Sequence, residues 1–426
     1  MAQYEQEVIP VNRVKVLILL LLLGGVAGVG LPPGEVQEFR VGRLINIGVS
    51  PGHDYIAIVF PQEIRVFSPE LEPLFSLSLD GGERPWAVAV AGDYLACGTS
   101  AGLVRLWGLP TGQPLREWRE IPGMVWCLAF SPDGTRLAAG GLDGTLIVWD
   151  TASGEEVYRD AFAGGVWGLE FSPQGELLAV GLSQGVGLVD LDSGSEVRTL
   201  GGLSGEAWGL AFSPGGDRLA VGTAAGEVGA WGQAGWTPLW IQAGHEEPVW
   251  TVAFDHSGDH LLSAGTDRTV KIWRAADGLE LGALALHATA VRLVTPLARP
   301  GDILSASEDG KLARWDLPRV LSLRPQVRGV FYAERIRAGR AQVIMVSFQD
   351  QNRDLSYCYL ELVEGDKARV VVSPGWSFRP HLSGHGATSF SFSLTVEAPQ
   401  RIRLRLVLVD GAGLRSDPYE FEVEAY

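Results

Sequence analysis

The stretch MVWCLAFSPDG at residues 124–134 recurs as GVWGLEFSPQG at residues 165–175 and as EAWGLAFSPGG at residues 206–216. Each copy runs from alternating apolar residues into a turn that contains Ser-Pro and Gly. This pattern is typical of a β-strand that ends in a hairpin turn. The recurrence indicates a β-rich repeat, and it raises the question of why every copy holds a tryptophan at the same place.

The repeat extends well beyond these three copies. A first series of tryptophans is spaced by 40, 41, 41 and 42 residues, and it comprises Trp86, Trp126, Trp167, Trp208 and Trp250. A second series has nearly the same period and comprises Phe67, Trp107, Trp149, Val189, Trp231, Trp273 and Trp315. Seven units result, each with four short alternating runs. A four-stranded unit cannot bury both faces alone, so the units must stack, and radial stacking around a channel closes the series.

At this point the sequence resembles the WD40 repeat family, whose signature is a Gly-His pair, an FSPDG turn and a terminal Trp-Asp. The resemblance covers residues 36–326, and FSPDG, FSPQG, FSPGG, VWD at 148–150 and RWD at 314–316 all fall in register. It implies a seven-bladed β-propeller in an all-β fold, and it implies little about function.

The resemblance also implies a buried hydrogen-bond network that links a His, a Ser, an Asp and the terminal Trp of a blade. Two blades have the complete set, and these residues are His245, Ser263, Asp267 and Trp273, and His287, Ser305, Asp309 and Trp315. The third blade keeps Asp143 and Trp149 without the His, and the fourth has Val189 in place of the Trp. We interpret these polar residues as structural and not catalytic.

Two features of the propeller have alternative interpretations. Its last blade takes its outer strand either from residues 36–41, which the resemblance favours, or from residues 319–324. The slot at the start of the inner strand is occupied by Ile45, the five tryptophans and Arg292. Alternation places Trp126 on the same side as Leu128 and Phe130, which predicts packing between blades. The alternative is a rim of exposed aromatic rings and Arg292 that binds a ligand at the mouth of the channel.

The N-terminus carries a hydrophobic segment. Arg13 and Lys15 precede an uncharged, mostly aliphatic run at residues 16–31, which ends before Pro32 and Pro33. The run predicts either a cleaved export signal or a retained anchor within residues 1–34. In both cases the rest of the chain crosses the membrane, so we expect an extracytoplasmic protein that is secreted or anchored to the cytoplasmic membrane.

Residues 327–426 lose the repeat and contain six or seven alternating runs separated by Gly, Asp and Pro turns. This texture resembles an immunoglobulin-like or fibronectin-like β-sandwich. The segment DQNRD at residues 350–354 begins like a calcium loop, but Leu355 stands where the glycine of that loop belongs.

Composition and motifs exclude several kinds of function. A formal charge of −16 argues against nucleic-acid binding, and three scattered cysteines are too few for a disulfide framework or a zinc site. GTSAG at 98–102 and GLSQG at 181–185 match a nucleophile elbow, but both precede predicted strands and not helices. Histidine pairs at 256 and 260 and at 381 and 385 lie in predicted turns, so we expect no metal site, and no cofactor motif is present.

These observations predict a non-catalytic, exported scaffold that binds a protein or peptide partner through one face of the propeller. The candidate binding residues are Trp86, Trp126, Trp167, Trp208, Trp250 and Arg292. One alternative is glycan or cell-wall binding through an aromatic rim. Another is an exported propeller hydrolase or lyase, although the slot residues are a poor acid/base set.

Overall fold

The computed structural model of the protein describes most of the chain. The described residues are 15–19, 36–50, 52, 54–79, 82–324, 326–331, 335–336, 341–349, 355–364, 368–371, 376–379, 385–396, 400–410 and 413–425. The chain divides into two compact units. One comprises Pro33–Glu280 and Ala285–Leu317, and the other comprises Met1–Pro32, Leu281–Leu284 and Pro318–Tyr426.

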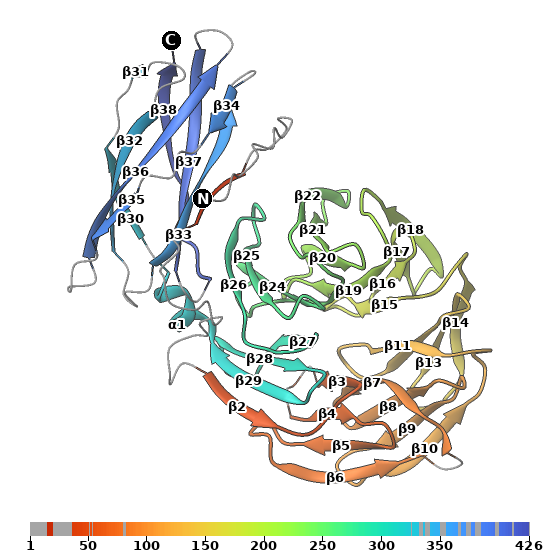
Figure 1. The fold of residues 1–426 in the computed structure, drawn as a ribbon. Coiled ribbons are helices and arrows are strands. Elements are labelled where there is room, and N and C mark those ends of the chain that lie inside the picture. Colours follow the sequence, from red (N-terminus) through yellow and green to blue (C-terminus); the bar gives the residue numbers. More distant parts are fainter. Residues whose placement is uncertain are drawn as a thin grey trace. The chain divides into compact units, whose positions relative to one another are not determined.

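Seven four-stranded antiparallel sheets form a propeller, which confirms the predicted fold of the repeat region (Figure 1). Blades 1 to 3 consist of β3 (Asn46–Val49), β4 (Ile56–Val59), β5 (Glu63–Phe67) and β6 (Pro73–Ser78); β7 (Pro85–Ala91), β8 (Tyr94–Thr99), β9 (Val104–Gly108) and β10 (Gln113–Trp118); and β11 (Val125–Phe130), β12 (Arg136–Gly141), β13 (Thr145–Asp150) and β14 (Glu156–Ala161).

Blades 4 to 6 repeat the same order along the chain. They consist of β15 (Gly168–Phe171), β16 (Leu177–Leu182), β17 (Gly185–Asp190) and β18 (Ser195–Leu200); β19 (Ala207–Phe212), β20 (Arg218–Thr223), β21 (Glu227–Gly232) and β22 (Thr237–Ala243); and β23 (Val249–Phe254), β24 (His260–Gly265), β25 (Val270–Arg274) and β26 (Glu280–Leu284). The first strand of each blade is the innermost, because these strands contact one another in sequence around the ring and β27 contacts β3.

Blade 7 is assembled from both ends of the propeller sequence. It consists of β27 (Val291–Pro296), β28 (Asp302–Ser307), β29 (Lys311–Asp316) and, as its outer strand, β2 (Val36–Arg40). Strand β2 pairs antiparallel with β29, with Val36 opposite Trp315 and Arg40 opposite Lys311. Of the two closing segments that the sequence left open, the N-terminal one is therefore used. Residues 319–324 do not form a strand, since helix α1 (Leu317–Ser322) occupies most of that segment.

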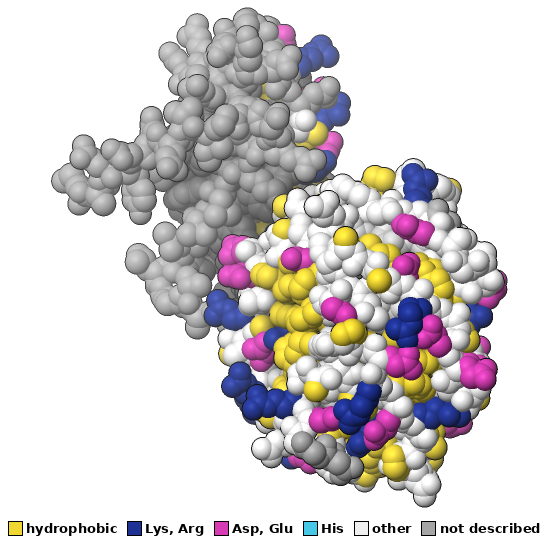
Figure 2. All heavy atoms as spheres, turned by 90° about the vertical axis from the view of Figure 1, so that its right-hand side faces the viewer, with side chains coloured by type: hydrophobic (Ala, Val, Ile, Leu, Met, Phe, Trp, Pro, Cys, Tyr) yellow, Lys and Arg dark blue, Asp and Glu magenta, His cyan; other side chains and the backbone are white. Residues whose placement is uncertain are grey.

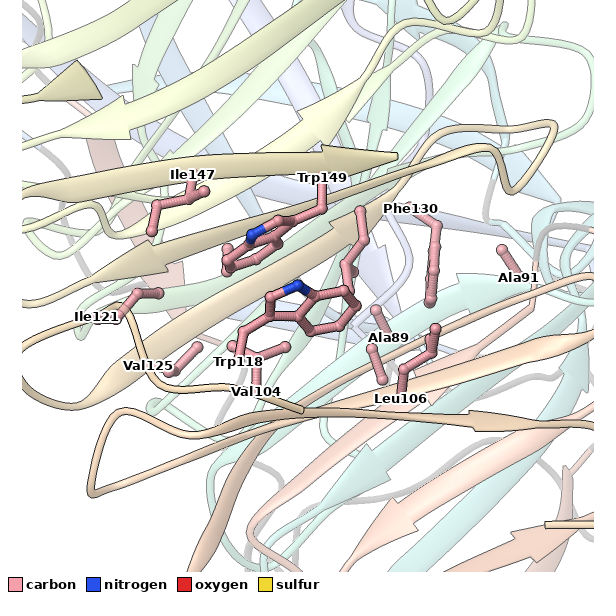
Figure 3. Packing of buried hydrophobic residues seen from close by; sticks show 13 residues of the cluster. Ala89, Ala91, Val104, Leu106, Trp118, Ile121, Val125, Phe130, Ile147 and Trp149 are labelled. Atoms are coloured by element: carbon pink, nitrogen blue, oxygen red, sulfur yellow. The ribbon is translucent and has the colours of Figure 1, made fainter. Parts of the chain in front are cut away.

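The core of the propeller lies between neighbouring blades. In β13, Ile147 and Trp149 pack in a cluster with blade 2, while Leu146 and Val148 pack in a cluster with blade 4. Figure 3 shows the first of these clusters, in which the indole of Trp118 from blade 2 lies against that of Trp149, with ring centroids 4.9 Å apart. Each middle strand thus buries both sets of alternating side chains.

Blade 3 lacks the complete polar network, and one buried indole N–H group in this cluster has no acceptor among the described residues. Trp273 and Trp315 donate their indole N–H to Ser263 and Ser305, each ten residues earlier in the chain. The residue ten positions before Trp149 is Ala139, and the Nε1 atom of Trp149 is buried without a hydrogen-bond partner among the described residues. A buried donor without an acceptor costs about 1–3 kcal/mol.

We expect Ala139→Ser to stabilise the protein by about 0.5–1.5 kcal/mol, because the new hydroxyl would accept the hydrogen bond from Trp149. The measurement is the free energy of unfolding in urea for the full chain. Ala138→Ser is the matched control, since Ala138 is equally buried but packs toward blade 4, where it meets apolar residues. A stability change for Ala139→Ser that is no more favourable than that of the control would contradict the interpretation.

The second unit contains two further sheets. One has the order β1-β33-β37-β38-β31, and the other has the order β30-β32-β36-β34, with β35 paired to β36. Their strands are β1 (Lys15–Leu19), β30 (Gln326–Phe331), β31 (Arg335–Ile336), β32 (Ala341–Gln349), β33 (Leu355–Glu364), β34 (Ala368–Val371), β35 (Trp376–Arg379), β36 (His385–Val396), β37 (Gln400–Asp410) and β38 (Tyr419–Ala425). The segment at residues 350–354, whose sequence begins like a calcium loop, lies outside the described residues.

The hydrophobic N-terminal segment is described in part. Residues Lys15–Leu19 form β1, which pairs antiparallel with β33. The rest of the run, residues 20–31, lies outside the described residues. Within the described part of the chain, no helix has the length and apolar character needed to span a membrane.

Candidate functional site

The slot at the start of the inner strand is shaped by a β-bulge in five of the seven blades. In β11 the pairing register shifts between Val125 and Cys127, so Trp126 is the extra residue of a bulge. The same shift occurs at Trp86, Trp208, Trp250 and Arg292. A bulge leaves its extra residue unpaired and turns the side chain away from the regular alternation.

The bulge corrects the prediction that Trp126 shares a face with Leu128 and Phe130. Phe130 belongs to the cluster with blade 2 that Figure 3 shows, and Leu128 packs against this cluster, whereas Trp126 is absent from it. Uninterrupted alternation was the wrong assumption, because one extra residue reverses the side chain's direction.

The five tryptophans instead contact one another across the mouth of the channel, and we call them the Trp cluster. The ring of Trp126 lies 5.3 Å from those of Trp86 and Trp167, 6.3 Å from Trp208 and 6.4 Å from Trp250, between centroids. Trp208 and Trp250 are closer still, at 4.4 Å. Trp126 and Trp250 belong to blades 3 and 6, on different sides of the ring, so the cluster fills the axis at this end of the propeller.

All five rings, together with Ile45 and Arg292, are neither buried nor fully exposed. The two alternatives for the slot, packing between blades and an open aromatic rim, both differ from this arrangement. The indoles pack on one another and keep part of their surface in solvent. They form an apolar floor at the mouth and not a ring of separate, freely exposed side chains.

Residues 16 positions after the slot hold several of these side chains in place. Trp250 donates its indole N–H to Thr266 at 2.9 Å, and Trp167 donates to Ser183 at 3.3 Å. In blade 5 the equivalent residue is Ala224, and Nε1 of Trp208 is buried without a partner among the described residues.

Arg292 completes the floor. Its guanidinium carbon lies 3.6 Å from the centroid of the Trp250 ring, which is a cation–π arrangement. The same side chain forms an ion pair with Glu308, 16 residues later. Burial lowers the pKa of Arg292, and the negative charge of Glu308 opposes this effect.

The predicted polar network of blade 6 is a directed chain of hydrogen bonds. Trp273 donates to the hydroxyl of Ser263 at 2.8 Å, the Ser263 oxygen lies 2.7 Å from Nε2 of His245, and Nδ1 of His245 lies 2.9 Å from the Asp267 carboxylate. The geometry satisfies each member when Nδ1 carries the proton. Burial works against ionisation of Asp267, but the hydrogen bonds from His245 and Thr269 outweigh it and lower the pKa to about 2.

Blade 7 differs from the predicted network by one residue. His287 approaches Ser305 at 2.8 Å as expected, but its Nδ1 lies 2.9 Å from Ser307, which in turn donates to Asp309 at 2.6 Å. The sequence pattern missed Ser307, because it assumed a direct bond between His287 and Asp309. Burial, with a smaller effect from Lys311, lowers the pKa of His287 to about 4, so the imidazole is neutral at pH 7.

Two segments of the propeller match the family model described as "WD domain, G-beta repeat", at residues 112–150 and 236–274. These are WD40 repeats. Together with the seven blades and the His-Ser-Asp-Trp networks, they make this domain a WD40 propeller.

Known relatives are similar over short segments. Protein ROOT INITIATION DEFECTIVE 3 from Arabidopsis thaliana is 40% identical over 58 residues, which is 14% of this chain and 13% of the relative. SEC12-like protein 1 from Arabidopsis thaliana is 40% identical over 80 residues, or 17% and 20% of the two chains. Protein groucho from Drosophila melanogaster is 32% identical over 80 residues, or 18% and 11%. The matches thus span a fifth or less of these relatives.

One residue of the WD40 propeller was missed by the sequence reasoning. Glu170 lies on the inner strand β15, three residues after Trp167, where other blades have Gly48, Ala89, Ala129, Ala211, Ala253 and Thr295. Ala129, its counterpart in blade 3, packs toward the next blade, so Glu170 faces blade 5. Aligning the repeats would have found it as the single acidic residue of a column of small ones.

Burial raises the pKa of Glu170 to about 8, and no hydrogen bond or ion pair with a described residue offsets this effect. The side chain keeps some solvent-accessible surface. Its carboxyl group therefore prefers the protonated form in the folded protein at neutral pH.

The elbow-like motifs centre on turns between strands, the first histidine pair lies at the turn that leads into β24, and His381 of the second pair lies outside the described residues. Ser100 and Ser183, at the centres of the two elbow-like motifs, lie at turns between strands β8 and β9 and between β16 and β17. His260 of the first histidine pair bonds to Asp255 at 3.0 Å. Within the described residues, no group of three or more His, Cys, Asp and Glu side chains is placed to hold a metal ion.

We expect Glu170→Gln to stabilise the protein at pH 8 and to have little effect near pH 4. Below the unfolded-state pKa of 4.5 both states bind the proton. Between 4.5 and about 8 the unfolded state ionises while the folded state does not, so the wild type loses stability as pH rises, by an order of a few kcal/mol.

The measurement is the free energy of unfolding in urea for wild type and variant from pH 4 to pH 9. Other titrating groups contribute equally to both and cancel in the difference. Exposed Glu155→Gln serves as the matched control and should show no such pH-dependent gain. A difference for Glu170→Gln that is independent of pH would show that the pKa of Glu170 is the same in the folded and unfolded states.

Proposed function

We propose that this protein is a non-catalytic scaffold whose WD40 propeller binds a protein or peptide partner at the mouth that the Trp cluster fills. The carrying observation is that five indoles, four of them placed by bulges, meet at the axis and keep part of their surface in solvent. Tryptophan and arginine are the side chains most enriched among residues that dominate binding energy.

General properties of the fold support a binding role. WD40 propellers are mostly non-catalytic scaffolds, and they generally bind protein partners. The partners of the relatives are not transferred to this chain, because each shared segment is short. The Trp cluster and Arg292 are properties of this chain's own slot residues, and they locate the proposed surface.

Two other candidate functions differ in what the mouth would contact. Partly exposed indoles also stack on sugar rings, so glycan binding would use the same surface. A hydrolase or lyase would need convergent acid and base groups in the channel. Among the described inner-strand residues, Glu170 is the one carboxylate, which gives the enzyme alternative less support than the binding one.

We expect the double variant Trp126→Leu, Trp208→Leu to lose partner binding by about 1,000-fold, because residues that dominate an interface contribute about 2 kcal/mol or more each. Leucine keeps the mouth apolar while removing the indoles. The measurement is affinity capture with the full chain as bait, followed by binding curves for the captured partners. Near-ultraviolet circular dichroism reports whether the variant is folded.

The matched control is Leu115→Ala, Leu239→Ala. These outer-strand side chains are 50% and 48% exposed, so the control also removes exposed apolar surface, but away from the mouth. A folded tryptophan variant that captures the same partners as wild type would place the binding surface elsewhere. Retention of the wild type on a polysaccharide column, lost in the tryptophan variant, would favour the glycan alternative.

The proposed scaffold acts outside the cytoplasm. The basic flank and aliphatic run at residues 16–31 support export or anchoring. We expect the variant that lacks residues 16–31 to stay in the cytoplasmic fraction, whereas the intact chain is exported or sediments with membranes. Equal distribution of both chains between fractions would contradict export. The immunoglobulin-like or fibronectin-like character of residues 327–426 remains part of this proposal.

A further inference from the structure

Charged side chains are distributed unevenly around the mouth of the propeller. The position two residues before each slot lies in the loop that leads into the inner strand, so its seven occupants form a ring around the Trp cluster. From blade 1 to blade 7 these residues are Arg43, Arg84, Met124, Gly165, Glu206, Pro248 and Ala290. Both cations of the ring fall in neighbouring blades 1 and 2, and its anion falls in blade 5.

The basic arc consists of Arg43 and Arg84. Both side chains are exposed, and neither forms an ion pair with a described residue. Arg292 adjoins this arc in blade 7, where its charge is offset by Glu308. The neighbouring Glu83 is likewise offset, since it forms an ion pair with Arg119 at 2.8 Å. The uncompensated charge of the arc is therefore positive.

The acidic arc consists of Glu206, Glu246 and Glu247. Glu246 and Glu247 precede Trp250 in the loop into blade 6 and are exposed, and Glu206 precedes Trp208. Within the described residues, no ion pair reaches any of these three carboxylates. The exposed Arg268 of blade 6 directly follows Asp267 in the chain, and the opposite charges of these two residues cancel. The three glutamates therefore leave the arc with a net negative charge.

The two arcs lie on opposite sides of the channel. Seven blades around a closed ring are about 51° apart, which separates the middle of blades 1 and 2 from the middle of blades 5 and 6 by roughly 150°. The Trp cluster lies between them. In the view of Figure 2, basic and acidic side chains are interspersed over the surface of the propeller. Several of the propeller's exposed charges are also paired, as Arg159 is with Glu156 and Glu120.

We propose that the mouth recognises a polypeptide segment that has an apolar centre, acidic residues on one side and basic residues on the other. This inference rests on the proposed function and specifies the chemistry of the partner. The apolar centre covers the Trp cluster, the acidic side meets Arg43 and Arg84, and the basic side meets Glu206, Glu246 and Glu247. Charge of opposite sign at the two ends allows one orientation of the segment and opposes the reverse.

The test is a selection of random 12-residue peptides displayed on phage, with the full-length protein immobilised as bait. A parallel selection uses the variant Trp126→Leu, Trp208→Leu, so that peptides dependent on the Trp cluster are identified. We expect these peptides to share an apolar centre with acidic residues toward one end and basic residues toward the other. Synthetic peptides with the same centre and uniformly acidic or uniformly basic ends should bind about tenfold more weakly or worse.

Charge reversal examines the acidic arc directly. Glu246→Lys, Glu247→Lys should weaken a selected peptide by about tenfold or more and should improve binding of the uniformly acidic peptide. The matched control is Glu155→Lys, Glu176→Lys, which makes the same change in net charge with exposed residues at turns on the other end of the blades. Because the arcs are exposed, the selected peptide should also bind more weakly as salt rises.

The outcomes separate the two proposals. Peptides that depend on the Trp cluster but show no charge asymmetry, or that respond equally to the two charge reversals, would overturn the inference and leave the proposed function standing. Peptides that bind independently of the Trp cluster, or a selection that enriches none, would count against the proposed function itself.

Discussion

Every blade of this propeller has two apolar faces, and a sheet of that kind is stable only between two others. Strand β13 shows the constraint, because its alternating side chains enter two different clusters, one with blade 2 and one with blade 4. A row of such sheets would leave an apolar face in water at each end, so the row must close. Strand β2 secures the closure by pairing with β29 and covering the outer edge of blade 7.

The seven inner strands converge at the axis of the propeller. In five of them, a bulge turns one side chain away from the clusters between blades. Large aromatic rings then fill the mouth by packing on one another, with Trp126 contacting four of the others. The same residues thus close the channel and provide an apolar surface that solvent still reaches, which is why stability and recognition are linked at this position.

Polar residues of the core follow the rule that a buried network stabilises only when each member is satisfied. Blades 6 and 7 keep complete chains from tryptophan to carboxylate. Blade 3 has apolar residues in place of His and Ser, and the indole of Trp149 is left without an acceptor among the described residues. Glu170 is a second departure, since a carboxyl group takes a place that other blades give to small residues.

The sequence by itself determined the number of blades, their strands and the positions that repeat. It could do so because side-chain direction alternates locally along a strand, and because the 41-residue period brings equivalent residues to equivalent places. It also identified all eight residues of the two polar networks, but it missed Ser307, which relays between His287 and Asp309.

Only the tertiary structure decided which segment closes the ring, where the tryptophans point, what surrounds Glu170 and how charge divides around the mouth. Residues 36–41 and 319–324 both alternate, so pattern alone could not choose between them. A bulge is set by pairing with the neighbouring strand. The burial of Glu170 and the placement of opposite charges across the axis depend on residues that are 40 or more positions apart. Local periodicity carries no information about such contacts, and they exist only once the ring has closed.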